Sequence, residues 1–344
     1  MAEQYRAVLW NPQTRRYDRL IAALVVGFLV VFVLSQILLF PNITPETLII
    51  RATGSLAFLL LHLILMIGPL ARLDRRLLPL LYNRRHLGVS MFLIALVHGI
   101  FNLIQFHSLG DLDPISSLFL SNPRYESLTQ FPFQILGFFA LLILYVMAAT
   151  SHDFWLKNLG PKRWKSLHMA VYVAYALLLG HVLLGTLQLE QHPGGYGLLI
   201  LGMIGIVSLH LLAAFRSKQA KESSSPDQEG FVKVCAPEDI QEDRAKTLLV
   251  GKENIAIFKY QEKLSAVSNR CRHQMGPLGE GKVIDGCITC PWHGYQYLPH
   301  NGQSPPPFTE KVETYRLKLF EGSIWVHPAP MPPGTEIRPT PIPA

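Results

Sequence analysis

The chain has 344 residues, of which 49% are hydrophobic and only 16% are charged, and its formal net charge is +7. The apolar excess is concentrated before residue 216, so the first two-thirds of the chain do not have the composition of a soluble domain. The four cysteines form no evenly spaced set, so the sequence indicates no disulfide framework and favours a reducing compartment.

Six stretches before residue 216 are long enough to span a bilayer, which takes about 20 apolar residues. A single apolar helix is compatible with a soluble core, but six in succession predict a membrane all-α bundle of six helices. The first stretch is too long and too uniformly apolar for a signal peptide, and no small-residue cleavage site follows it. The predicted spans are 19–40, 47–72, 86–106, 131–150, 165–188 and 195–215.

Lys and Arg are concentrated in alternate segments between these spans, and such residues mark the cytoplasmic side of a membrane. The intervening loops 41–46, 107–130 and 189–194 are poor in basic residues. The bias predicts a multi-pass protein of the inner (cell) membrane with both termini cytoplasmic, and it explains the net charge without a nucleic-acid partner. The basic residues are Arg6, Arg15, Arg16, Arg19, Arg72, Arg75, Arg76, Arg84, Arg85, Lys157, Lys162, Arg163, Lys165, Arg216, Lys218 and Lys221.

The composition changes after the predicted membrane domain of residues 1–216. Residues 217–229 are polar, rich in Ser and interrupted by Pro226, which indicates a flexible linker. Residues 230–328 alternate short strands in the manner of a small all-β domain, and the Pro-rich tail 329–344 has no periodicity and is expected to be disordered. No internal repeat of useful period is evident. The predicted strands are 231–235, 247–250, 255–260, 264–268, 282–289, 314–319 and 323–327.

Two loops of the predicted β-domain each carry one Cys and one His, as Cys271 with His273 and Cys290 with His293. Two Cys and two His are the ligand set of a Rieske [2Fe–2S] centre, and also of a Cys₂His₂ zinc site. A zinc finger carries its two Cys close together and its two His on a following helix. The spacing therefore favours the iron–sulfur cluster over zinc.

The residues around these ligands read Arg-His-Gln-Met-Gly-Pro-Leu in the first loop and Cys-Pro-Trp-His-Gly in the second. Both segments resemble the ligand loops of Rieske-type ferredoxins, and the resemblance covers the C-terminal domain. It implies that Cys271 and Cys290 bind the buried iron and that His273 and His293 bind the outer one.

The resemblance also bears on the reduction potential of the cluster. High-potential Rieske proteins of the respiratory chain have two further Cys that bridge the ligand loops and a Ser that hydrogen-bonds the cluster. The corresponding positions here are Gly276, Trp292 and Tyr295, and only Tyr297 matches the second hydrogen-bonding position. Fewer hydrogen bonds to the sulfurs stabilise the reduced cluster less, so a moderately low-potential, ferredoxin-like centre is expected.

Six histidines fall within the predicted spans, where ionisable side chains are costly and usually mark a functional site. Depths follow from a rise of about 1.5 Å per residue, counted from the cytoplasmic ends. His86, His168 and His210 lie within roughly the inner third of the bilayer. His98 and His181 lie deeper, and His62 falls near the middle. Two layers predict two haem b groups, each held by histidines of different helices. His168 and His181 are about 140° apart in azimuth on an ideal helix, so they serve two haems or the helix bends between them. The six are His62, His86, His98, His168, His181 and His210.

Three blocks of the membrane domain carry a second resemblance. They read Gly-Pro-Leu-Ala-Arg-Leu from residue 68, Arg-Arg-His-Leu-Gly from residue 84, and Leu-Gly-Pro-Lys-Arg-Trp-Lys-Ser-Leu-His from residue 159. Residues 45–215 resemble the ferric-reductase-like transmembrane haem domain, and in particular the haem-binding membrane subunit of the methionine sulfoxide reductase system. This resemblance implies that His98, His168 and His181 are haem ligands.

The fourth axial ligand is left open, because His86, His62 and His210 have no firm counterpart in that family. For His62 and His210, a hydrogen bond between helices is at least as good an interpretation as haem ligation. His86 lies beside two Arg at the interface, where solvation or contact with a haem propionate are the alternatives.

These features predict transmembrane electron transfer. A cytoplasmic flavin or ferredoxin reductase would reduce the Rieske cluster, and electrons would pass through two haems to an outer-side redox partner or quinone. No G-x-G-x-x-G fingerprint follows a predicted strand, so oxidation of NAD(P)H requires a partner protein. Two alternatives remain: reverse flow from quinol or an outer donor to a cytoplasmic Rieske-dependent oxygenase, and a redox-sensing haem and Fe–S membrane protein.

Overall fold

The computed structural model describes residues 12–74, 77, 80–81, 84–189, 194–219, 227–250, 253–273, 276–291 and 294–343. The chain forms two compact units, one with Pro12–Gly68 and Asn83–His210, the other with Pro69–Tyr82 and Leu211–Ala344. Several residues of the predictions lie outside the described part, namely the ligand His293, the basic residues Arg6, Arg75, Arg76 and Lys221, and most of the linker.

The N-terminal part of the chain is helical, as predicted. The helices that correspond to the predicted spans are α1 (Pro12–Leu39), α2 (Pro45–Leu73), α3 (Arg84–His107), α5 (Gln134–Ala149), α7 (Val171–Leu189) and α8 (Gly194–Gln219). Two further helices, α4 (Pro114–Leu120) and α6 (Asp153–His168), were not predicted as separate elements.

Within the described residues, four helical stretches are long and apolar enough to cross a membrane, and the predicted count of six spans is not confirmed. The reason is length, since α5 and the apolar part of α8 are shorter than the roughly 20 residues that cross a bilayer without adjustment. The four stretches are Arg15–Leu39, Pro45–Leu73, Arg84–His107 and Arg163–Gly185, and the shorter apolar helices are Gln134–Ala149 and Leu199–Phe215.

The fifth predicted span, 165–188, begins later in the structure. Helix α6 is kinked at Gly160, whose φ of 74° is the left-handed conformation that glycine adopts readily, and it ends at His168. Helix α7 begins at Val171. His168 and His181 are therefore on two successive helices, which agrees with the alternative that the chain bends between them.

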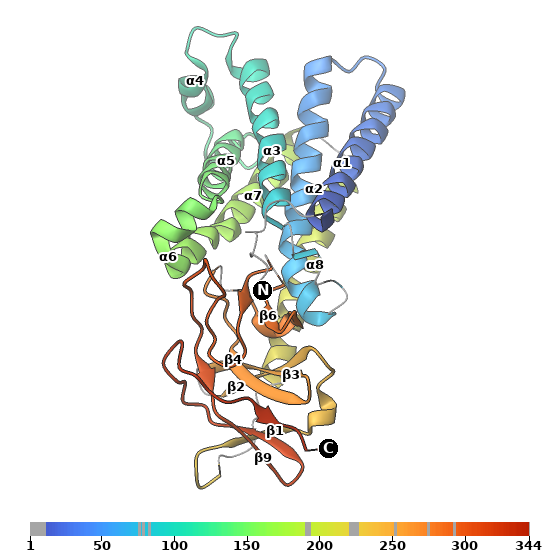
Figure 1. Cartoon of the computed structure of the whole chain (residues 1–344). Coiled ribbons are helices and arrows are strands. Elements are labelled where there is room, and N and C mark those ends of the chain that lie inside the picture. The colour runs from blue at the N-terminus through green and yellow to red at the C-terminus, as the bar shows by residue number, and fades with distance from the viewer. Residues whose placement is uncertain are drawn as a thin grey trace. The chain divides into compact units, whose positions relative to one another are not determined.

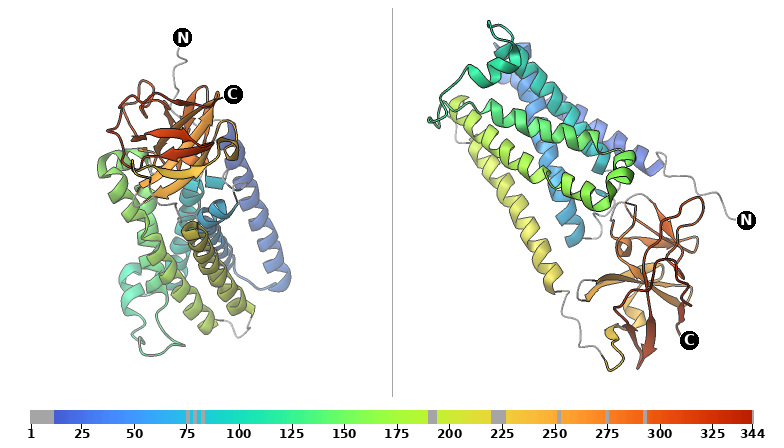
Figure 2. Two further views of the ribbon diagram at one scale, coloured as in Figure 1. Left: turned by 90° about the horizontal axis from the view of Figure 1, so that it is seen from below. Right: turned by 90° about the vertical axis from the view of Figure 1, so that its left-hand side faces the viewer.

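Small residues set the packing of the helices, as expected where lipid supplies no hydrophobic drive for association. Helix α5 packs against both α3 and α7 (Figures 1 and 2). A Cβ added at Gly99 of α3 would lie 2.8 Å from Leu141 of α5, and one at Gly180 of α7 would lie 3.1 Å from Leu136 of α5. These glycines allow α5 to approach both of its neighbours closely.

The C-terminal part is a β-structure of three antiparallel sheets with the orders β1-β10-β9, β11-β4-β3-β2 with β8 also on β4, and β5-β6-β7. The predicted strand 282–289 is in fact a hairpin, because Asp285 and Gly286 both have positive φ, at 51° and 76°. The strands are β1 (Val232–Cys235), β2 (Arg244–Val250), β3 (Glu253–Tyr260), β4 (Lys263–Ser268), β5 (Lys282–Ile284), β6 (Cys287–Thr289), β7 (Gln296–Tyr297), β8 (Thr314–Tyr315), β9 (Leu317–Phe320), β10 (Ser323–Val326) and β11 (Thr340–Pro341).

The Pro-rich tail is ordered as far as residue 343, so the expectation of disorder is wrong. Strand β11 pairs with β4, with Thr340 opposite Leu264. The N–H of Met331 donates to the carbonyl of Thr314 at 2.9 Å. Proline removes the periodic pattern that marks a strand, but the residues between the prolines still donate hydrogen bonds to the domain.

Candidate functional site

The two predicted ligand loops of the β-domain are closed by the same hydrogen bond. The N–H of Cys271 donates to the carbonyl of Gly276 at 2.9 Å, and the N–H of Cys290 donates to the carbonyl of Tyr295 at 2.7 Å. In the second loop, Gly294 has a φ of 69°, and its N–H donates to the carbonyl of Cys290 at 2.9 Å. Each cysteine therefore begins a loop of the same length and closure.

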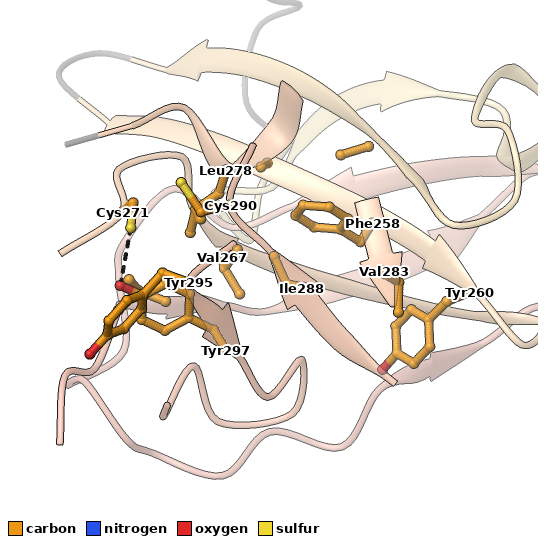
Figure 3. Close-up of a cluster of buried hydrophobic side chains, with 13 residues drawn as sticks. Phe258, Tyr260, Val267, Cys271, Leu278, Val283, Ile288, Cys290, Tyr295 and Tyr297 are labelled. Atoms are coloured by element: carbon orange, nitrogen blue, oxygen red, sulfur yellow. Dashed lines mark hydrogen bonds between the residues drawn. The ribbon is translucent and has the colours of Figure 1, made fainter. Parts of the chain in front are cut away.

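Cys271 and Cys290 are buried, each with 1% exposure, and neither is in a disulfide. Both belong to one hydrophobic cluster, and Figure 3 shows them at one end of it. The Nδ1 atom of His273 is also buried. Thiolates are soft donors that suit an iron–sulfur cluster, and imidazole also binds iron. The donor types of these described residues agree with three of the four ligands predicted for a [2Fe–2S] cluster, and the fourth, His293, lies outside the described residues.

The hydroxyl of Tyr297 lies 3.4 Å from Cys271 Sγ, and the dashed line in Figure 3 marks this contact. The hydroxyl oxygen accepts a hydrogen bond from the N–H of Arg272 at 2.9 Å, so its own proton is available to the sulfur. Burial, and next the negative charge of a Cys271 thiolate, raise the pKa of Tyr297 well above its usual value. Tyr297 therefore stays a hydrogen-bond donor at neutral pH.

Replacing Tyr297 with Phe is expected to lower the midpoint potential of the cluster. A hydrogen bond to a charged group is worth about 1.5 kcal/mol, and about 59 mV corresponds to a tenfold change for one electron, so the drop is on the order of 60 mV. A redox titration followed by EPR measures it. Tyr260→Phe is the control, because Tyr260 belongs to the same cluster but bonds Ser265 at 3.0 Å. An equal potential in the Tyr297→Phe and wild-type proteins would contradict the assigned hydrogen bond.

Tyr295 links the two ligand loops. Its ring stacks on the imidazole of His273, with centroids 5.1 Å apart and planes 8° from parallel. Its hydroxyl donates to the carboxylate of Glu310. A residue of the second loop thus packs against the ring of His273, a predicted ligand in the first loop. No sequence pattern marks Glu310, because it belongs to a later loop that only the fold brings to this point.

In the helical unit, the structure brings together His98 of α3 and His181 of α7. Their ring centroids are 6.3 Å apart and the ring planes are 86° from parallel. Nδ1 of His98 lies 2.9 Å from the carbonyl oxygen of Ile50 in α2, and Nδ1 of His181 lies 2.9 Å from that of Phe133, the N-cap of α5. A carbonyl only accepts, so each Nδ1 carries the hydrogen and each Nε2 keeps its lone pair. Among the described residues, neither Nε2 has a hydrogen-bond partner.

This pair has the dimensions of an axial ligand pair. An imidazole nitrogen binds a transition metal at about 2 Å and the ring centroid lies about 1 Å behind that nitrogen, so two rings on one ion have centroids about 6 Å apart. The observed 6.3 Å agrees with this value. A backbone carbonyl on the far nitrogen is also one of the common partners of a metal-bound histidine. The separation of His98 and His181 therefore matches the value expected for two imidazoles on one metal ion, and these two residues would hold a haem iron between them.

His62 and His210 are engaged differently. In each ring, Nδ1 lies 2.9 Å from the carbonyl oxygen four residues earlier in the same helix. Nε2 of His62 lies 3.1 Å from the hydroxyl of Tyr175, and Nε2 of His210 lies 3.1 Å from that of Tyr172. Both nitrogens of each ring thus have protein partners, and the two Nε2 contacts connect α2 and α8 to α7.

The remaining two candidates lie near the ends of helices. His168 stacks on Trp164, with centroids 3.9 Å apart, and its Nε2 lies 3.4 Å from the hydroxyl of Thr150. His86 is exposed, and its Nδ1 lies 3.0 Å from the carboxylate of Asp18 in α1. The structure thus brings two of the six candidate histidines into one pair and gives the other four contacts with other residues.

A buried histidine that the motifs do not mark is His107, at the end of α3. Its Nδ1 lies 3.0 Å from the hydroxyl of Ser117 in α4, and its Nε2 lies 3.1 Å from Oε1 of Gln134 in α5. These contacts join three helices. The segment around α4 is otherwise rich in turn residues, and its sequence does not indicate that Ser117 would bond a histidine of α3.

A helical membrane domain with a facing imidazole pair and a β-domain with two Cys–His loops define a membrane protein of electron transfer. Residues 230–316 match the Rieske [2Fe-2S] domain, and residues 53–179 match the ferric reductase like transmembrane component. The chain is therefore a ferric-reductase-like transmembrane domain fused to a C-terminal domain of the Rieske family, which confirms both predicted resemblances.

Relatives of each half are known separately. The anthranilate 1,2-dioxygenase ferredoxin subunit of Burkholderia cepacia is 31% identical over 93 residues, which are 27% of this chain and 86% of that one. The protein-methionine-sulfoxide reductase heme-binding subunit of Ralstonia nicotianae is 31% identical over 137 residues, which are 40% of this chain and 58% of that one. The chain thus spans little more than half of the second relative.

Among solved structures, the complex of reduced oxygenase and oxidized ferredoxin in carbazole 1,9a-dioxygenase contains a similar chain. It is 24% identical, the likeness covers 30% of this chain and 98% of that chain, and the TM-score is 0.28.

Proposed function

We propose that this protein carries electrons across a membrane, from a cytoplasmic flavin or ferredoxin reductase to an outer-side redox partner or quinone. The [2Fe–2S] cluster at Cys271, His273, Cys290 and His293 would receive the electrons, and two haem b groups would take them through the bilayer. The observation that carries the proposal is the His98–His181 pair, whose centroid separation of 6.3 Å suits a haem held from two sides.

Two backbone carbonyls next to this pair hold both imidazoles in the tautomer whose Nε2 can bind a metal. The carbonyls of Ile50 and Phe133 fix the hydrogen on Nδ1 of each ring. If both imidazoles held one haem, the haem would supply electron transfer and would have no open position for another ligand. In this proposal, His168 supplies one ligand of the second haem. His86 is preferred as the other ligand over His62 and His210, because both ring nitrogens of the latter two are in hydrogen bonds.

The proposed membrane domain is a six-helix bundle in the inner (cell) membrane, with both termini cytoplasmic. The shorter helices α5 and α8 would complete it, since a short span is accommodated by local thinning of the bilayer and by flanking residues. The orientation is supported by described basic residues at the same side of successive spans, with Arg15 and Arg19 in α1, Arg84 and Arg85 in α3, and Arg163 in α6.

Stepwise anaerobic reduction of the purified full-length protein tests the proposal. We expect a low-spin, bis-imidazole haem spectrum in the oxidised protein and a Rieske-type EPR signal after reduction. A β-domain that contains zinc and no iron would contradict the cluster, and a haem-free protein would contradict the membrane half.

Reverse flow is the second candidate, and the relatives of the Rieske domain favour it. They include ferredoxin components of an anthranilate 1,2-dioxygenase and of an alkene monooxygenase system. In this version an outer donor or quinol reduces the haems, and the cluster delivers electrons to a cytoplasmic oxygenase. The same titration separates the two directions, because outward flow needs haem potentials at or above that of the cluster and inward flow needs the opposite order.

A further inference from the structure

Two glycines on helices other than α3 and α7 lie directly against the facing histidines. A Cβ added at Gly54 of α2 would lie 2.8 Å from Nδ1 of His98, and one at Gly137 of α5 would lie 2.7 Å from Nδ1 of His181. Real Cβ atoms essentially never come this close to another heavy atom. At either position any larger residue would therefore displace the imidazole ring.

Each glycine also follows the carbonyl that holds the ring. Gly54 comes four residues after Ile50, and Gly137 comes four residues after Phe133, so glycine and carbonyl lie one turn apart on the same side of the chain. The nearest ring atoms to each added Cβ are Nδ1, Cε1 and Cγ. The edge of each ring that carries Nδ1 thus lies against the glycine, and the same Nδ1 donates to the carbonyl of Ile50 or Phe133.

The two arrangements recur with the same spacing along the chain. His98 and His181 each follow the residue that supplies their carbonyl by 48 positions. Each also follows its glycine by the same number of positions, 44. The carbonyl residue, the glycine and the histidine thus recur at the same spacing in the two arrangements. The sequence pattern does not reveal this repeat, because the residues around these three positions differ.

A third glycine shows what is special about these two. Gly202 of α8 approaches His62, but the atom nearest to its added Cβ is Nε2, which lies 3.1 Å from the hydroxyl of Tyr175. Close packing of glycine against histidine therefore does not by itself leave Nε2 without a hydrogen-bond partner. At Gly54 and Gly137 the glycine lies against the Nδ1 edge of the ring, and among the described residues Nε2 has no hydrogen-bond partner.

We propose that Gly54 and Gly137 are positioning residues that set the distance and tautomer of the His98–His181 pair for one haem. The absence of a side chain lets each ring reach the carbonyl one turn earlier, which fixes the hydrogen on Nδ1 and leaves Nε2 to ligate. Glycine is less favourable than alanine in a helix, so its presence in α2 and α5 calls for a packing reason of this kind. The inference rests on the proposed haem site of the helical unit.

The test compares Gly54→Ala and Gly137→Ala with Gly88→Ala and Gly205→Ala in the full-length protein. The control glycines are also helical, and an added Cβ would meet nothing within 4 Å at either one. For the two positioning glycines, we expect the low-spin bis-imidazole haem signal to fall about twofold, as it does when one of two such haems loses its ligand pair. The controls are expected to keep the full signal. The Rieske EPR signal of the same samples measures the amount of folded protein.

A double variant separates positioning from general damage. Gly54→Ala combined with His98→Ala is expected to lose no more low-spin haem than His98→Ala alone, because both changes act on the same ligand. Full low-spin signal in both Gly54→Ala and Gly137→Ala would overturn the inference, and so would an equal loss in the controls. A wild-type protein without low-spin haem would overturn the proposed function itself, which is a different result.

Discussion

Replacing either His98 or His181 with Ala is expected to remove one haem and leave the other. The two rings are the only pair of facing imidazoles among the described residues of α3 and α7, at a centroid separation of 6.3 Å. A haem that loses one of two axial ligands loses its low-spin spectrum and much of its affinity. We therefore expect each variant to lose roughly half of the haem absorbance, if two haems are bound. Quantitative visible spectra and EPR of the purified variants measure the loss.

His62→Ala and His210→Ala are the matched controls for this experiment. Both are histidines of the same helical unit, but their rings bond a carbonyl and a tyrosine hydroxyl. These variants are expected to keep the His98–His181 haem. His168→Ala should instead remove the other haem. The ligand assignment fails if His98→Ala, His168→Ala and His181→Ala all retain full bis-imidazole spectra.

Truncation before Gly230 is expected to stop haem reduction by the cytoplasmic route while both haems stay bound. The haem ligands proposed here all precede that residue, and the cluster ligands all follow it. A flavin reductase with NAD(P)H should then reduce the haems of the full chain but not those of the truncated one, whereas dithionite should reduce both. The measurement is the rate of appearance of the reduced haem bands.

Two controls make this result specific. Cys290→Ser in the full-length chain should reproduce the truncation, because it removes a predicted cluster ligand without removing the domain. The reductase should act on inverted membrane vesicles and not on right-side-out ones, because the proposed orientation places the Rieske domain on the cytoplasmic side. Unchanged haem reduction in the truncated protein would show that the cluster is not on the path, and would favour reverse flow or a redox-sensing role.

The local features of both halves could be predicted from the sequence. Hydrophobic runs mark helices because each must satisfy its own backbone in lipid. The two Cys–His loops could be recognised because a cluster ligand set lies within a short stretch of chain. The hairpin at Asp285 and Gly286 and the order of the Pro-rich tail could not, because they depend on pairing with distant strands such as β4.

The candidate haem site also has features that the sequence predicts and features that depend on the fold. The sequence by itself determined the order of an apolar part followed by a Rieske-like part, the Cys and His side chains of the two loops, and the presence of six histidines within the predicted spans. Only the tertiary structure decided that His98 faces His181, that Tyr175 and Tyr172 contact His62 and His210, and that Gly54 and Gly137 make room for the facing rings. The physical reason is that ligand choice depends on which ring nitrogen remains without a hydrogen bond, and this is set by atoms of other helices far away in the chain.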